Sequence, residues 1–146
     1  MQAQPHDGPR LEQLSASRKK NNMNVVLWII PAVLAIVFLA AGTMKIAQPK
    51  AKLAAAGQGW VEDFSGNTVK LIGTLEILAA LGLILPELLK IATILVPTAA
   101  AGLFLLMAGA AITHSRRHET PNIIINVVLA ILAAGVAIAR FGPYSL

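Results

Sequence analysis

The feature that most limits the fold is an uncharged run of 20 residues, from Val25 to Met44. At about 1.5 Å per residue, a helix of this length crosses the hydrocarbon core of a bilayer, which is roughly 30 Å thick. The run does not alternate apolar and polar residues, which argues against a transmembrane β-barrel strand. It is also longer than the apolar core of a signal peptide, about 7–15 residues. We therefore predict an uncleaved transmembrane helix.

Three more apolar runs follow the first. The spans are predicted from Thr68 to about Leu85, from about Ile91 to Thr113, and from about Asn122 to Ala139. Pro97 would remove a hydrogen bond inside the third span, so we expect a kink there. The sequence thus predicts an all-α fold, an integral membrane four-helix bundle.

The composition agrees with a single membrane domain. Of the 146 residues, 56% are hydrophobic and 13% are charged, whereas a soluble domain has about 25% charged residues. The absence of cysteine excludes disulfides, thiol relays and cysteine-ligated metal within this chain. The net charge of +5 is typical of basic residues that flank a membrane, so we expect lipid as a partner and no nucleic acid.

The segments outside the spans have distinct patterns. Residues 1–24 are polar without apolar periodicity, and we predict a disordered basic cytoplasmic tail before a four-span domain over residues 25–142. In the first loop, Pro49 and Gly57 bracket an alanine-rich run, which predicts a short interfacial helix.

The turns between spans are predicted from their capping residues. Asn67 and Thr120 are expected to cap the second and fourth spans, with Pro121 in the first turn of the fourth. Pro86, Glu87 and Lys90 suggest a tight turn after the second span.

Four spans place both termini on one side of the membrane. Lysine and arginine are evenly divided between the two sides, so the positive-inside rule does not fix the orientation. We expect the bacterial cytoplasmic (inner) membrane with cytoplasmic termini, because a polar tail without a signal peptide need not be translocated.

Glu76 is the most informative polar residue, because it lies near the middle of the second span. A carboxylate at that depth costs about 2.5 kcal/mol or more unless it is paired or protonated. Gly73 and Ala80 share its face, and small residues let another helix approach closely. Two readings stay open: a ligand or proton site, and a structural acid bonded to a neighbouring helix.

Further polar residues sit at helix ends. Lys45 ends the first span and could extend to the head groups or turn inward toward Glu76. Asn126 and Arg140 lie on one alanine-rich stripe of the fourth span, which predicts an inward face.

A charged cluster follows the third span. His114 and His118 share a helix face, a spacing that can hold a metal, but too few ligands accompany them, so we expect no metal. Arg116, Arg117 and Glu119 suggest a charged interfacial loop instead, and are secondary polar candidates together with Arg140 at the opposite end.

We predict one polar network centred on Glu76. Lys45 or Asn126 should be its nearest partner, His114 should lie at the mouth, and Arg140 should stand apart. Buried polar groups need partners in hydrocarbon, so convergence costs less than separate burial. No catalytic residue is assigned.

The chain resembles the DoxX-like family of small four-helix bacterial membrane proteins over about residues 25–142. The matching segments are Ala40–Lys45, Lys70–Glu76, Leu81–Pro86, His114–Arg117, Glu119, Asn126 and Ala139–Phe141.

The resemblance implies a role in membrane redox biology. The first hypothesis is a non-catalytic accessory or assembly subunit of a membrane oxidoreductase, in a quinone-linked or oxidative-stress system. The alternatives are a membrane enzyme subunit that binds a quinone or another small molecule, and a proton-coupled carrier acting as a homo-oligomer. No cofactor motif stands in the sequence, and quinone enters only through the resemblance.

Overall fold

A computed structural model describes residues 8–146. All regular secondary structure within this range is helical. The elements in chain order are α1 (Gly8–Ala47), α2 (Lys50–Ala55), the 3-10 helix η1 (Gly59–Asp63), α3 (Gly66–Leu89), α4 (Leu95–Arg116) and α5 (Thr120–Phe141). The four long helices α1, α3, α4 and α5 are long and apolar enough to cross a membrane, which confirms the four-helix prediction.

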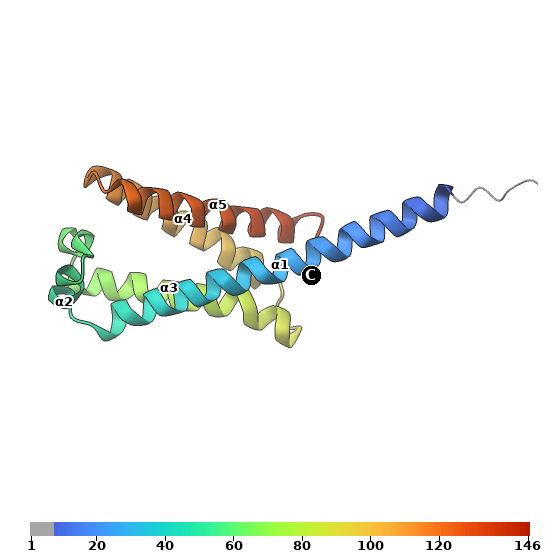
Figure 1. Ribbon diagram of the computed structural model, residues 1–146. Coiled ribbons are helices and arrows are strands. Elements are labelled where there is room, and N and C mark those ends of the chain that lie inside the picture. The colour runs from blue at the N-terminus through green and yellow to red at the C-terminus, as the bar shows by residue number, and fades with distance from the viewer. Residues whose placement is uncertain (1–7) are drawn as a thin grey trace, which may run out of the picture.

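The bundle is built from two helix pairs, α1 with α3 and α4 with α5, which meet mainly where α3 packs on α4 (Figure 1). The core between the pairs contains Phe38 from α1, Leu83 from α3, Met107 from α4 and Val136 from α5. Large side chains elsewhere point outward, as Ile138 does at 71% exposure. Such exposure suits a surface that faces lipid.

Two glycines let α1 and α3 touch. A Cβ on Gly42 would lie 2.5 Å from the Gly73 carbonyl oxygen, and one on Gly73 would lie 2.8 Å from the Gly42 carbonyl oxygen. Small residues at a crossing allow membrane helices to approach this closely. The crossing brings the last two turns of α1 against the first half of α3.

The first helix is longer than the sequence pattern suggested. Residues 8–24, predicted as disordered, form the first turns of α1 and stand clear of the bundle (Figure 1). The segment is rich in good helix formers, and extending an existing helix costs much less than starting one. Residues 1–7 of the predicted tail lie outside the described part of the chain.

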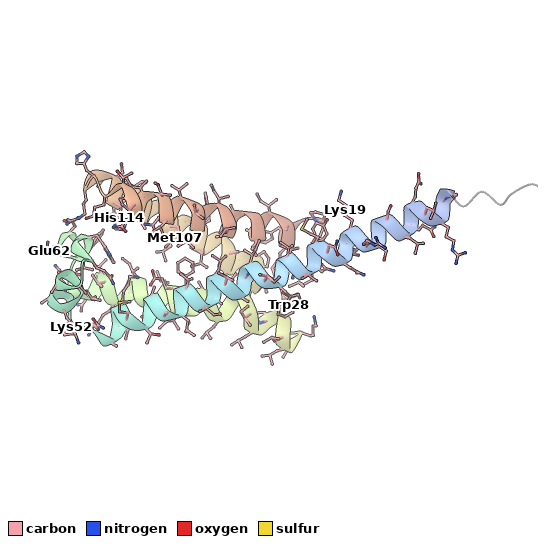
Figure 2. All side chains as sticks on the ribbon, viewed as in Figure 1. Lys19, Trp28, Lys52, Glu62, Met107 and His114 are labelled. Carbon is pink, nitrogen blue, oxygen red and sulfur yellow. The ribbon has the colours of Figure 1, made fainter. Side chains whose placement is uncertain are left out.

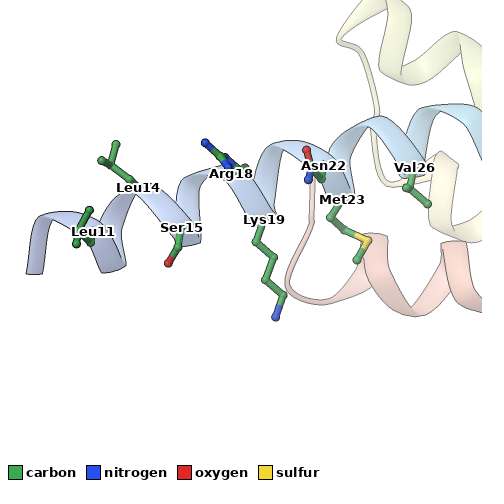
Figure 3. Close-up of a pocket in the computed structure, with 8 residues that line it drawn as sticks. All are labelled: Leu11, Leu14, Ser15, Arg18, Lys19, Asn22, Met23 and Val26. Atoms are coloured by element: carbon green, nitrogen blue, oxygen red, sulfur yellow. The ribbon is translucent and has the colours of Figure 1, made fainter. Parts of the chain in front are cut away.

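One face of this projecting segment forms a shallow hollow (Figure 3). Leu11 and Leu14 line it together with Arg18 and Lys19, and both leucines are exposed. All of its lining residues belong to α1, so the hollow has a wall on one side only.

The first loop contains the expected short helix. Helix α2 follows Pro49, and Gly57 adopts a φ of 90°, a conformation that glycine accommodates readily. Leu53, Val61 and Val69 form a small second core beneath this loop.

Two predictions at the ends of α3 are wrong. Ser65 rather than Asn67 caps the helix, because its hydroxyl accepts a hydrogen bond from the Thr68 amide at 3.1 Å. The helix also continues through Pro86 to Leu89 instead of turning at Pro86. Proline there removes a single backbone bond close to the helix end, and the extra turn buries Glu87.

The last two spans begin elsewhere than predicted. Helix α4 starts at Leu95, so Pro97 lies in its first turn and the expected kink inside the span is wrong. A first-turn amide has no partner within the helix, so proline costs little at that position. Glu119, not Thr120, is the N-cap residue of α5, and Pro121 occupies the first turn as predicted.

Candidate functional site

Glu76 and Lys45 form an ion pair at the crossing of α1 and α3. The Lys45 ammonium donates to both carboxylate oxygens of Glu76, at 2.9 and 2.8 Å. The Lys45 and Glu76 side chains are only 11% and 4% exposed. Two buried opposite charges satisfy one another here, which offsets the large cost of placing either one in the membrane alone.

A cavity of about 400 Å³ opens beside this pair. The four main candidates from the sequence, Lys45, Glu76, His114 and Asn126, all line it. Each comes from a different long helix, so the cavity lies at the meeting point of all four spans. We call it the pocket, and the end of the bundle that holds it the pocket end.

The pocket has an apolar side and an aromatic side. Its apolar side includes Leu106 and Met107 of α4, and Figure 2 shows Met107 and His114 on the inner side of that helix. Trp60 and Phe64 add the aromatic side, with their rings in an edge-to-face contact at 5.9 Å between centroids. The Lys45 ammonium lies 5.8 Å from the Trp60 ring centroid, within range of a cation–π attraction.

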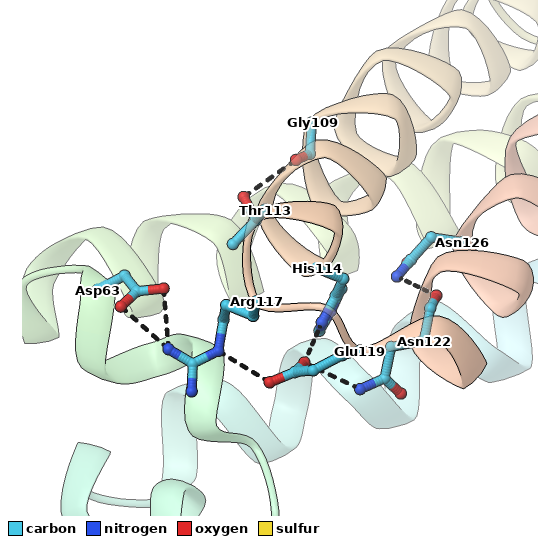
Figure 4. A network of polar contacts seen from close by, with 8 residues as sticks. All are labelled: Asp63, Gly109, Thr113, His114, Arg117, Glu119, Asn122 and Asn126. Atoms are coloured by element: carbon cyan, nitrogen blue, oxygen red, sulfur yellow. Dashed lines mark hydrogen bonds and ion pairs between the residues drawn. The ribbon is translucent and has the colours of Figure 1, made fainter.

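Glu119 organises the turn between α4 and α5 at the edge of the pocket (Figure 4). Its carboxylate accepts hydrogen bonds from Arg117 Nε at 2.8 Å and from Asn122 Nδ2 at 3.1 Å. His114 Nδ1 lies 2.5 Å from the same carboxylate. These bonds, Arg117 first, lower the pKa of Glu119 to about 2.

The ionised Glu119 sets the tautomer of His114. A carboxylate only accepts hydrogen bonds, so the proton of a neutral His114 resides on Nδ1. The Nε2 atom is then a bare acceptor on a side chain that lines the pocket. No residue between 8 and 146 hydrogen-bonds to that atom.

Arg117 ties the aromatic side of the pocket to the same turn. Its Nη1 atom lies 3.1 Å from both oxygens of Asp63, the last residue of η1 (Figure 4). Hydrogen bonds to Glu119 and Asp63 raise the pKa of Arg117. A Cβ on Gly59 would lie 2.7 Å from Arg117 Nη2, so glycine leaves room for the guanidinium. The arginine therefore links η1, which carries Trp60, to the turn that carries Glu119.

Two other predicted residues have no direct bond to the Glu76 pair. Asn126 lines the pocket, but its amide donates to the Asn122 carbonyl oxygen at 2.8 Å. Arg116 is exposed at the end of α4 and makes no side-chain hydrogen bond within residues 8–146.

Arg140 lies at the opposite end of the bundle, which we call the termini end. Its Nη2 atom donates to both oxygens of Glu87, at 2.8 and 3.0 Å, and both side chains are buried. It also reaches the Leu27 carbonyl oxygen at 3.3 Å. That carbonyl is the one that Pro31, four residues later in α1, cannot engage, so the arginine replaces the missing backbone partner.

The placement of Glu87 in a turn is wrong, because α3 continues through Pro86 and buries Glu87 against Arg140. A signal was present in the spacing. Glu76 and Glu87 are eleven residues apart, which is close to three full helical turns and puts them on one face.

Comparison of the sequence with models of known protein families finds a match to one family. The model of the DoxX-like family matches residues 29–136, which cover all four spans in part or in full. No curated protein and no solved structure matches the chain.

Proposed function

The chain belongs to the DoxX-like family, and we propose that it binds a small lipid-soluble molecule by a polar head group in the pocket at the pocket end of the bundle. One observation carries this proposal: Lys45, Glu76, His114 and Asn126, from four different helices, line one cavity of about 400 Å³. That volume falls in the range of small-molecule sites, which combine mostly apolar walls with a few polar groups.

The charges beside the pocket favour a neutral head group. Lys45 and Glu76 neutralise one another, and Glu119 is bonded to Arg117. An anionic ligand would compete with Glu76 for Lys45, and a cationic one would compete with Lys45 for Glu76. Either exchange would leave a charge without its partner in a low-dielectric site, which is costly.

The hydrogen-bonding groups favour carbonyl or hydroxyl oxygens. An ammonium has three protons, and two of those on Lys45 are directed at Glu76. The third can donate to a ligand carbonyl. His114 Nε2 can accept from a ligand hydroxyl, and Trp60 with Phe64 offers aromatic surface for a flat ring. A quinone carbonyl can accept from Lys45, and a hydroquinone or phenol can in addition donate its hydroxyl proton to His114 Nε2.

The cellular role that we propose is an accessory subunit of a membrane redox system, with this pocket as its ligand site. The support is the membership of the DoxX-like family and the fit of a quinone-type head group. The content of the purified protein tests this role. We expect an organic extract of protein isolated in mild detergent to contain a quinone or a related phenol at a near-stoichiometric level.

Trp60 provides a direct binding assay, because the chain has only two tryptophans. The Trp28→Phe chain in lipid nanodiscs keeps Trp60 as its sole indole reporter. Titration with duroquinone, a quinone without a tail, should quench Trp60 fluorescence along a saturating curve. Durohydroquinone, whose hydroxyl can donate to His114 Nε2, should compete with duroquinone for the pocket. His114→Leu in the same background should raise the Kd of durohydroquinone by about tenfold, since it removes one hydrogen-bonding partner.

The matched control is Trp60→Phe, which keeps Trp28 in α1, outside the pocket. It should show only the linear quenching of random collisions. The proposal is wrong if Trp60 is quenched linearly as well, or if His114→Leu leaves the Kd of durohydroquinone unchanged.

A further inference from the structure

A second cavity, of about 390 Å³, lies between α3 and α4 nearer the termini end. We call it the groove. From α3 it is lined by Leu75, Ala79 and Gly82, among others, and from α4 by Thr98, Gly102 and Leu106. The Thr98 hydroxyl donates to the Ile94 carbonyl oxygen at 2.8 Å, so its donor is already used within the helix. The groove therefore offers an almost wholly apolar surface.

Small residues shape the groove. A Cβ on Gly82 would lie 3.0 Å from the Ala99 Cβ, so the two helices are in close contact at that point. Gly102 is exposed, and a Cβ built on it would have no neighbour within 4 Å. The groove thus has a closed floor at Gly82 and open space above Gly102.

The groove adjoins the pocket at Leu106, which lines both cavities. On α4 the residues that line the two cavities lie along one face of the helix. The pocket side holds Gly109 and Thr113 on α4, and the groove runs back along that helix to Leu95. Leu95 and Leu106 are eleven residues apart, or about 16 Å along the helix. The polar pocket and the apolar groove, which is about three helical turns long, therefore lie end to end along α4.

We propose that the groove holds the apolar tail of the molecule whose head group occupies the pocket. This inference rests on the proposed function and narrows its ligand to one class: a neutral carbonyl or hydroxyl head with a long flexible hydrocarbon or isoprenoid tail. The tail can reach the groove from the bilayer, because the groove is apolar along its length and Gly102 on its wall is exposed.

Tail length is the variable that tests the inference. Duroquinone and a quinone with a long isoprenoid tail are titrated against the Trp28→Phe chain and against the same chain with Gly102→Phe. Gly102 lines the groove and not the pocket, so Gly102→Phe adds a ring on the groove side. We expect it to raise the Kd of the tailed quinone by about tenfold and to leave that of duroquinone within about twofold. Comparing variants at fixed lipid content cancels partitioning into the bilayer.

Gly135→Phe is the matched control, because Gly135 is an exposed glycine of α5 that lines neither cavity. It should change neither Kd. If Gly102→Phe leaves the binding of the tailed quinone intact, the tail does not lie in the groove and the inference is overturned. If duroquinone does not bind the parent chain, the proposed function itself fails, so the two failures are distinguishable.

A second measurement does not depend on any variant. A tailed quinone with a photoreactive diazirine near the tail end should crosslink mainly to residues 75–82 and 95–106. A diazirine phospholipid at the same concentration is the reference for bulk lipid. Crosslinks spread over all lipid-facing helices in the phospholipid's proportions would mean that the groove holds ordinary lipid, and would overturn the inference.

Discussion

Glu76 and Glu87 lie on the same face of α3. Each accepts hydrogen bonds through both carboxylate oxygens from a cationic side chain of another helix. Lys45 of α1 holds the first at the pocket end, and Arg140 of α5 holds the second at the termini end. Helix α3 is therefore bound to α1, its own partner, at the pocket end and to α5 of the other pair at the termini end. The first ion pair holds one helix pair together, and the second joins the two halves of the bundle.

The Lys45–Glu76 pair should show strong coupling in a double-mutant cycle. Glu76→Leu or Lys45→Met alone strands a buried charge, and each should lower the free energy of unfolding by about 3 kcal/mol. Glu76→Gln should cost less, because the amide keeps an acceptor for Lys45. The double variant should be more stable than the sum of the single losses predicts. Unfolding in mixed micelles gives these values, and additive losses would contradict a direct pair.

The Arg140–Glu87 pair should affect stability without affecting the pocket. Arg140→Met leaves Glu87 buried without its cation and should also cost about 3 kcal/mol. Because Arg140 lies at the opposite end, the Kd of duroquinone measured through Trp60 should stay within about twofold of the parent value. A large loss of binding in a folded Arg140→Met chain would show that the two ends are coupled.

The crossing of α1 and α3 should not tolerate a methyl group. A Cβ at Gly73 would lie 2.8 Å from the Gly42 carbonyl oxygen and 2.9 Å from the Lys45 Cβ. Gly73→Ala should therefore push the helices apart and destabilise the fold by about 1–3 kcal/mol. Gly135→Ala, whose added methyl meets nothing within 4 Å, should be neutral or slightly stabilising. Equal unfolding free energies for the two variants would count against the close crossing.

Acid should loosen the turn that Glu119 organises. Its folded pKa is depressed to about 2 from an ordinary value of 4.5. A lowered carboxylate pKa stabilises the fold above the unfolded pKa, and that stabilisation is lost as the pH falls from about 4.5 to about 2. The thermal midpoint of the parent should fall over this range more steeply than that of Glu119→Gln, which has no carboxylate to protonate. Parallel curves would refute the assignment.

Single cysteines can test the orientation, because the chain contains none of its own. Cysteines at Gln13, Gln58 and Ser145 would report the projecting part of α1, the first loop and the chain end. With cytoplasmic termini, an impermeant thiol reagent added to intact cells should label Gln58→Cys alone. Labelling of Gln13→Cys and Ser145→Cys instead would reverse the orientation, and opposite behaviour of those two would change the number of spans.

The spans could be predicted from the sequence because few backbone conformations satisfy their hydrogen bonds in lipid. Uncharged runs long enough to cross the bilayer must be helical there, and four of them appear as four helices. The inward position of Glu76 also followed from its small neighbours. Periodicity alone could not decide between Lys45 and Asn126 as its partner, because that choice depends on where Gly42 and Gly73 let α1 cross α3.

The helix ends were harder, since competing local signals have similar strength. Pro86 reads as a helix breaker, yet the burial of Glu87 against Arg140 carries α3 one turn further. Ser65 and Asn67 are both good caps, and the choice rests on which one the loop brings to the Thr68 amide. Residues 8–24 have little apolar pattern, but they are helical because they extend the helix of the first span toward its N-terminus.

The position of Arg140 also bears on biosynthesis, because it belongs to the fourth span, which is synthesised after the groups that Arg140 contacts. Until α5 is made, the Leu27 carbonyl beside the Pro31 break and the Glu87 carboxylate both lack the partner that the finished fold gives them. Arg140 of the fourth span supplies the missing partner of a carbonyl in the first helix and neutralises an acid in the second span. A nascent chain of three spans therefore holds an unpaired backbone carbonyl and an unpaired carboxylate in the bilayer, and α5 supplies the partner of both.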